Sequence, residues 1–136
     1  MTTTGPPGGA RADVELRLPA DSAYVSVLRT TSAGLAARLD FTLDDIEDLR
    51  MAVGEASALV LPEATDGTDM TCRFYMDQGR LTVAVAVESE TATAPDPDGF
   101  AWQVLTTLAG DASATVDGGR YEIALTMQSE TRDATG

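Results

Sequence analysis

The segment from residue 43 to residue 60 carries the clearest helical pattern in the chain, and it constrains the fold more than any other feature. Thr42, followed three residues later by Asp45, makes a capping box with Asp in place of the usual Glu. Pro62 marks the expected end of the helix. Apolar residues recur at the spacing of a helix that packs one face against a sheet: Leu43, Ile46, Leu49, Val53, Ala56 and Val60.

Five other segments of the chain are predicted to be strands, and together they would form such a sheet. The first alternates apolar and polar residues and ends at Pro19. The turn residues Asp77-Gln78-Gly79 and Asp117-Gly118-Gly119 each join two later runs, which predicts two hairpins. The runs are residues 14–18, 70–76, 80–87, 112–116 and 120–127.

Two more helices are expected. Asp21 or Ser22 can cap a helix that runs to about Leu39. A short helix is predicted from about Phe100 to Ala109 because several large apolar residues gather there. The segment before it, residues 88–98, is polar and holds two prolines, so it is expected to be an exposed loop.

These elements predict an α+β fold, a two-layer sandwich in which about three helices cover one face of a mixed or antiparallel sheet. A chain of 136 residues with 43% hydrophobic content can bury one core without disulfides or metal. We expect one domain over residues 13–128, with a disordered tail on each side at residues 1–12 and 129–136.

Composition excludes several kinds of chemistry. The chain has no lysine and no histidine, which rules out a Ser-His-Asp triad, a histidine-ligated zinc, a P-loop lysine and a Schiff base. A formal charge of −13 argues against direct nucleic-acid binding. The single cysteine, Cys72, has no partner for an internal disulfide, and no apolar run is long enough to span a membrane. We therefore expect a cytoplasmic protein.

Two segments are similar to boxes of a known nucleotide-binding superfamily. One is similar to the N-box helix and reads Ile46-Glu47-Asp48-Leu49-Arg50-Met51-Ala52-Val53-Gly54-Glu55-Ala56. The other is similar to the glycine-containing helix start of the G2 box and reads Gly99-Phe100-Ala101-Trp102-Gln103-Val104-Leu105-Thr106-Thr107-Leu108-Ala109-Gly110. With the order of the elements, they make residues 14–127 resemble the Bergerat-fold (GHKL) ATPases. Within that superfamily the chain looks like the RsbW-type anti-sigma factors, small Ser/Thr-kinase-like regulators.

The resemblance implies roles for particular residues. Glu55 matches the family's catalytic glutamate, which activates a hydroxyl or water. One helical turn later the family carries an Asn that binds Mg²⁺, but here that position is Leu59, which has no lone pair to offer and is more simply a core residue. Gly99 and Ala101 match the phosphate-binding helix start, with Ala101 where a second glycine is expected. Glu55, Gly99 and Ala101 are thus the candidate cofactor-binding residues, and no metal ligand is assigned.

The family's adenine-binding box is missing. The strand that should precede it ends Val85-Ala86-Val87-Glu88-Ser89-Glu90, without an Asp-x-Gly-x-Gly sequence. Glu88 or Glu90 could replace the adenine acceptor, or either could be an ordinary loop acid. The segment at the place of the ATP lid is short and has no basic residue. We therefore expect ATP and Mg²⁺ binding to be weakened or lost.

Three functions remain open. The leading hypothesis is an anti-sigma factor that sequesters a sigma factor and is released by a STAS-type antagonist, the resemblance also implying a homodimer. The alternatives are an active kinase that phosphorylates the antagonist with Mg-ATP, and a non-catalytic dimerisation or small-ligand module. The acids of the early helices are the candidate partner-binding residues, or else simply a solvated face: Asp21, Asp40, Asp44, Asp45 and Asp48.

Overall fold

The structure is a computed structural model, and it describes residues 11–129. The expected tails, residues 1–12 and 129–136, lie outside the described residues except for Arg11, Ala12 and Ser129. Two short 3₁₀ turns, Ser22–Tyr24 and Leu61–Glu63, precede α1 and follow α2. The main elements are β1 Val14–Pro19, α1 Val25–Arg38, α2 Leu43–Val60, β2 Asp69–Asp77, β3 Arg80–Glu88, α3 Phe100–Leu108, β4 Asp111–Asp117 and β5 Arg120–Gln128.

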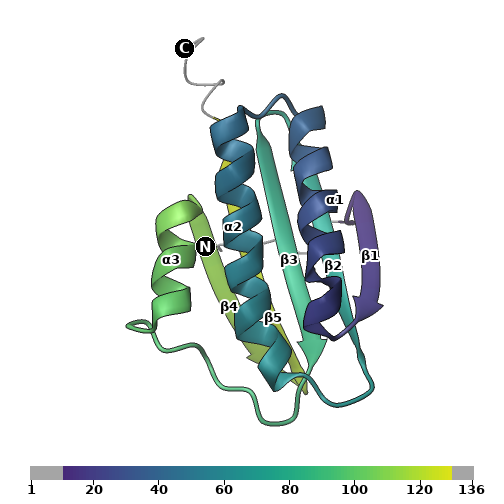
Figure 1. The fold of residues 1–136 in the computed structure, drawn as a ribbon. Helices are drawn as coiled ribbons and strands as arrows, with labels where there is room; N and C mark the ends of the chain where they lie inside the picture. Colours follow the sequence, from purple (N-terminus) through teal and green to yellow (C-terminus); the bar gives the residue numbers. More distant parts are fainter. Residues whose placement is uncertain (1–10, 130–136) are drawn as a thin grey trace.

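The five strands form one sheet in the order β1-β2-β3-β5-β4, and every neighbouring pair is antiparallel. The three helices lie on one face of this sheet, with α2 between α1 and α3 (Figure 1). The predicted α+β sandwich is therefore confirmed, and the sheet is antiparallel throughout. Helix α3 carries the chain from the end of β3 to β4, which leaves room for β5 beside β3.

Both predicted hairpins are present and have two-residue turns. Asp77 pairs with Arg80 around Gln78 and Gly79, and Asp117 pairs with Arg120 around Gly118 and Gly119. Gly79, Gly118 and Gly119 have φ values of 70°, 58° and 82°, a region that glycine enters at no steric cost.

The core lies between α2 and the central strands. From α2, Leu49, Val53, Ala56 and Val60 are fully buried, as the helical period predicts. Leu43 is a correction, because its side chain is 81% exposed. It is the first residue of α2 and lies three residues before Ile46, which places it about 60° round the helix from the apolar stripe.

The helix ends follow from local chemistry. Thr42 caps α2, its Oγ1 accepting a hydrogen bond from the Asp45 N–H at 3.1 Å, and Asp21 caps the turn before α1. Helix α1 ends in a Schellman motif, in which the Asp40 N–H donates to the Ala37 carbonyl at 3.0 Å and the Phe41 N–H donates to the Ala36 carbonyl at 3.1 Å.

The face of the sheet away from the helices carries small or polar side chains. The register of the strands places them in rows across the sheet, and the hydroxyls of Thr82 and Thr126 share a hydrogen bond of 2.9 Å between β3 and β5. We call this side the open face. On its three first strands it presents Glu15, Arg17, Thr71, Arg73, Tyr75, Thr82, Ala84 and Ala86.

Candidate functional site

Glu55 lies in the C-terminal half of α2 and is half-buried. The preceding residue, Gly54, faces α1, so one residue's rotation of about 100° turns Glu55 to the outward flank of α2, away from α1. Among residues 11–129 the Glu55 carboxylate has no hydrogen bond or ion pair. The side chain is therefore available, which is what its proposed role as a base requires.

Leu59 follows Glu55 by one helical turn and is half-buried, packed against the hydrophobic core. Its alternative interpretation as a packing residue agrees with this position. Because Mg²⁺ takes oxygen ligands, a leucine here leaves the helix without the metal ligand that the resemblance calls for. The described residues also hold no group of three or more His, Cys, Asp or Glu side chains able to bind a metal ion.

Gly99 and Ala101 lie at the start of α3. Gly99 is the N-cap residue, with φ −69° and ψ 149°, and no side chain caps this helix end. Its N–H donates to the Asp96 carbonyl at 2.9 Å, and the Asp96 carboxylate accepts a hydrogen bond from the Asp98 N–H at 2.9 Å. The carboxylates of Asp96 and Asp98 thus lie close in sequence to the N-terminus of α3, where the resemblance implies a phosphate.

The loop between β3 and α3 adds to this negative character. It contains Glu90, Asp96 and Asp98 and no basic residue. Ser89 begins it with a tight turn, its Oγ accepting from the Ala92 N–H at 3.0 Å. Glu88 alternates with the buried Val87 and lines a hollow on the open face, so it points away from the helices. Of the two acids proposed as adenine acceptors, Glu90 alone remains on the loop.

The donor set does not fit Mg-ATP. A hydrocarbon occupies the position that the resemblance assigns to the metal ligand, and the charged residues of the loop between β3 and α3 are all acids. At the positions that the resemblance assigns to the metal ion and the phosphates, the chain therefore offers a hydrocarbon and acidic side chains.

The five acids proposed for partner binding differ in position and in exposure to solvent. Asp21 caps a helical turn, Asp40 ends α1, and Asp44 is exposed in the first turn of α2. Asp48 is half-buried. Asp45 is only 4% exposed, so its side chain does not belong to a surface that a partner could reach.

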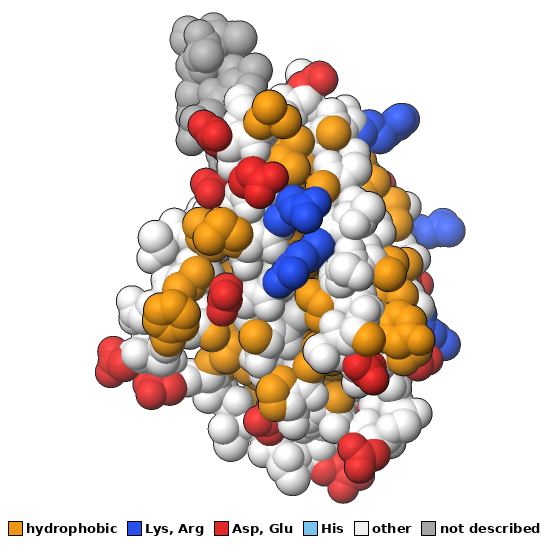
Figure 2. All heavy atoms as spheres, viewed as in Figure 1, with side chains coloured by type: hydrophobic (Ala, Val, Ile, Leu, Met, Phe, Trp, Pro, Cys, Tyr) orange, Lys and Arg blue, Asp and Glu red, His pale blue; other side chains and the backbone are white. Residues whose placement is uncertain are grey.

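Arg29, which the sequence analysis does not identify, lies at the junction of α1 and α2. The guanidinium of Arg29 lies directly over Gly54, in the space that a Cβ would occupy. Arg50 lies one turn before Gly54 on the same side of α2. Figure 2 shows basic side chains over this junction. Neither arginine has an ion pair within residues 11–129, although acids outnumber bases in the chain.

Arg29 also lines a hollow of about 330 Å³ between the two helices, together with the serines Ser22, Ser26 and Ser57. A glycine in the interior of a predicted helix is the sequence signal for this feature, because it marks a close approach of another group.

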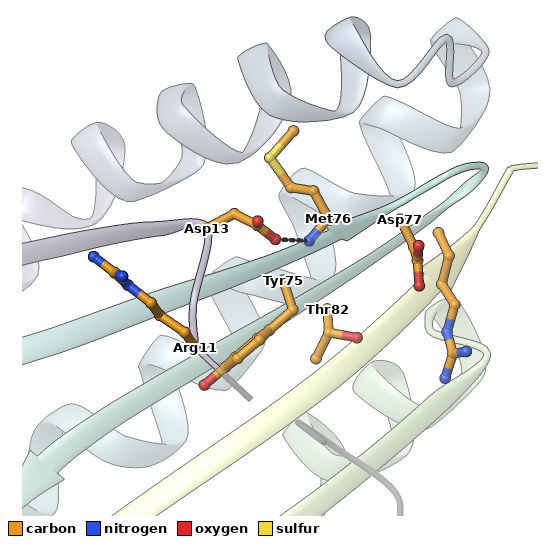
Figure 3. Close-up of a pocket in the computed structure, with 7 residues that line it drawn as sticks. Arg11, Asp13, Tyr75, Met76, Asp77 and Thr82 are labelled. Carbon is orange, nitrogen blue, oxygen red and sulfur yellow. Dashed lines mark hydrogen bonds between the residues drawn. The ribbon is translucent and has the colours of Figure 1, made fainter. Parts of the chain in front are cut away.

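The open face has hollows of its own. One has a volume of about 200 Å³. In this hollow the ring of Tyr75 lies between Arg11 and Thr82 (Figure 3). The Asp13 carboxylate accepts a hydrogen bond of 2.7 Å from the Met76 N–H, which ties the start of the described chain to β2. This hollow is on the opposite side of the sheet from Glu55.

The chain is similar to curated proteins named serine-protein kinase RsbW. It is 38% identical over 79 residues to the protein from Halalkalibacterium halodurans, and 36% identical over 81 residues to that from Bacillus subtilis. Each match covers 57% of this chain and 49% or 51% of the relative, so the chain spans about half the length of these relatives. No protein-family profile matches the chain.

A solved structure shows the same fold. The crystal structure of the RsbU and RsbW domains of a Mycobacterium tuberculosis protein aligns with a TM-score of 0.64 and 16% identity, covering 85% of this chain and 31% of that one. The resemblance predicted from the two boxes is thus confirmed, and the chain is related to the RsbW-type proteins. Within the described residues no helix is long and apolar enough to cross a membrane.

Proposed function

We propose that this relative of the RsbW serine-protein kinases is an anti-sigma regulatory factor that sequesters a sigma factor by binding alone. A STAS-type antagonist would compete for the same surface and release the sigma factor. Leu59 is the observation that carries the proposal, because it packs against the core at the position where a phosphotransfer enzyme of this kind needs a ligand for Mg²⁺. Regulation by occlusion needs no metal and no nucleotide.

The surface of the two early helices supports this proposal. Arg29 and Arg50 offer unpaired guanidinium groups at the α1/α2 junction, and such groups recognise carboxylates in bidentate fashion. Apolar side chains are exposed on the same helices and the turn before them: Tyr24 at 40%, Val27 at 41% and Met51 at 53%. A partner with acidic and apolar side chains on one face fits this surface, and Asp44 and Asp48 would meet basic residues at its margin.

The test is direct binding to each sigma factor of the source organism, followed by competition with its STAS-domain proteins. One sigma factor should bind, and one STAS protein should displace it without added nucleotide. Arg29→Glu should weaken the sigma complex at least roughly tenfold, since it places a like charge against an acidic partner. Arg38→Glu makes the same change of charge at the exposed end of α1 and serves as the matched control. Absence of binding to every sigma factor would refute the proposal.

The proposed unit is a homodimer, as the resemblance implies. Sedimentation equilibrium at several concentrations checks this, and a monomer at all of them would remove that part of the proposal.

An active kinase is the second candidate. The free Glu55 carboxylate favours it, as does the similarity to proteins named serine-protein kinase. Incubation of the chain with radiolabelled ATP, Mg²⁺ and the STAS antagonist distinguishes the two. Phosphate transfer that disappears in Glu55→Gln would support the kinase, and no transfer would support regulation by binding.

A further inference from the structure

The open face holds a hollow of about 570 Å³ for which the proposed function has no use. It lies where β1 and β3 end and where β2 and β5 begin, on the side of the sheet opposite Glu55. Three arginines from three different strands line it, Arg17 of β1, Arg73 of β2 and Arg120 of β5. In a chain this acidic, such a concentration of guanidinium groups calls for an explanation.

The strand register explains why the three arginines meet. Arg17 pairs with Thr71, and Arg73 lies two residues further along β2, so both side chains leave the same face. Thr71 pairs with Ala86, and Glu88, two residues later on β3, pairs with Arg120. The small side chains of Thr71 and Ala86 therefore form the floor from which the longer arginines rise.

The guanidinium groups are available to a ligand. Arg17 has no hydrogen bond or ion pair within the described part of the chain. Arg73 pairs with Glu15 at 3.1 Å and Arg120 with Glu122 at 3.5 Å, and in both pairs the side chains are partly exposed. Ion pairs of this kind contribute little to stability, so an incoming anion can compete for them.

The rim adds neutral donors. Gly118 and Gly119 line the hollow in the turn between β4 and β5, and their N–H groups have no acceptor among residues 11–129. The hydroxyl of Thr71 on the floor is likewise without a partner there. Free N–H groups in a turn with positive φ are a common way to hold an oxyanion.

The hollow also contains two carboxylates, which limit the chemical class of ligand that it can bind. Asp69 and Glu88 line the same hollow, so a bare anion meets repulsion as well as attraction. A ligand that carries hydroxyl or amino groups beside its anionic group would use both kinds of side chain, and the volume is too large for a phosphate ion alone. We propose that this hollow binds a phosphorylated small molecule that also carries hydroxyl or amino groups.

The test uses adenosine monophosphate as the probe and its two halves, adenosine and inorganic phosphate, as references. Amide resonances of the full chain are followed by NMR during each titration. The monophosphate should give saturable shifts at Gly118 and Gly119, and each half should bind more weakly. Arg17→Gln should weaken the monophosphate roughly tenfold, since one charged hydrogen bond is lost. Glu88→Gln should strengthen the binding of inorganic phosphate by removing repulsion, and it should weaken the monophosphate, which loses a charged acceptor for its hydroxyl or amino groups.

Arg38→Gln is the matched control, because it removes the same charge from the exposed end of α1. It should leave the affinity unchanged. The proposal is overturned if no saturable shift occurs at millimolar probe, if Arg38→Gln weakens binding as much as Arg17→Gln, or if the shifts lie at α2 and α3 instead. Circular dichroism establishes that each variant is folded before its affinity is compared. Because the hollow is remote from the α1/α2 junction, sigma binding and this result can fail independently.

Discussion

Asp40 has a backbone role at the C-terminal end of α1. The sequence makes it a candidate partner-binding acid, and the structure places it at φ 64°, the one non-glycine residue of positive φ within residues 11–129. It stands just after the C-terminus of α1, where a negative charge also opposes the helix dipole. The residue therefore terminates a helix at some cost to stability.

Asp40→Gly should raise the free energy of unfolding by about 0.5–1 kcal/mol, because glycine adopts this conformation freely and removes the charge. Asp40→Ala keeps a Cβ and should be less stable than Asp40→Gly. Urea denaturation measures both, and equal stabilities for the two variants would contradict the conformational explanation.

Cys72 faces the core from β2 and is fully buried. Burial raises the pKa of its thiol from 9.0 to about 12. The unfolded chain therefore loses the proton first as pH rises, so between these two values the folded state is progressively destabilised by this group. Cys72 is therefore a packing residue of the core.

We predict that Cys72 does not react with a thiol reagent in the native protein at pH 8 and reacts fully in denaturant. Absorbance of the released thiolate gives the measurement. Rapid reaction of the native protein, with no change in its circular dichroism, would show that the thiol is accessible.

At the scale of elements, α2 depends on its first turn. Thr42→Ala removes the hydroxyl that accepts the Asp45 N–H and should destabilise the protein by about 1 kcal/mol. Thr42→Ser keeps an oxygen in place and should retain most of the stability. Thermal unfolding of the two variants measures this difference. Equal losses of stability would show that the hydrogen bond from the cap does not stabilise α2.

The contact between α1 and α2 gives a second prediction at this scale. Gly54→Ala should favour the helix by up to about 1 kcal/mol, provided that the guanidinium of Arg29 moves aside. The same displacement should weaken sigma binding if Arg29 is part of the proposed surface. Urea denaturation and the sigma-binding assay are measured on the same variant. Unchanged sigma affinity in a stabilised Gly54→Ala would place the partner elsewhere.

The elements themselves were largely predictable because their signals are local. Thr42 and Pro62 bracket α2, and glycines mark both hairpins. The insertion of β5 between β3 and β4 was not predictable, because it depends on where α3 returns the chain to the sheet. The role of Arg29 was missed for a similar reason, since Gly54 meets it only when the two helices pack.

At the scale of the whole molecule, the two faces of the sheet differ: three helices cover one face, and the other is the open face. The helical side has the fold of an RsbW domain, and it carries Glu55 on α2 and Gly99 before α3, the residues to which the resemblance assigns nucleotide chemistry. The formal charge of −13 adds long-range repulsion to any polyphosphate. Binding to a protein partner faces no such obstacle when the contact is made through Arg29 and Arg50.

The most direct test of this account is calorimetric titration of the purified protein with Mg-ATP, alongside Leu59→Asn and a curated RsbW serine-protein kinase in the same buffer. We predict no saturable heat for the native chain, because the metal position is occupied by a hydrocarbon and the loop before α3 is acidic. Saturable binding by the native chain, strengthened further by Leu59→Asn, would contradict the account and make the kinase the leading function.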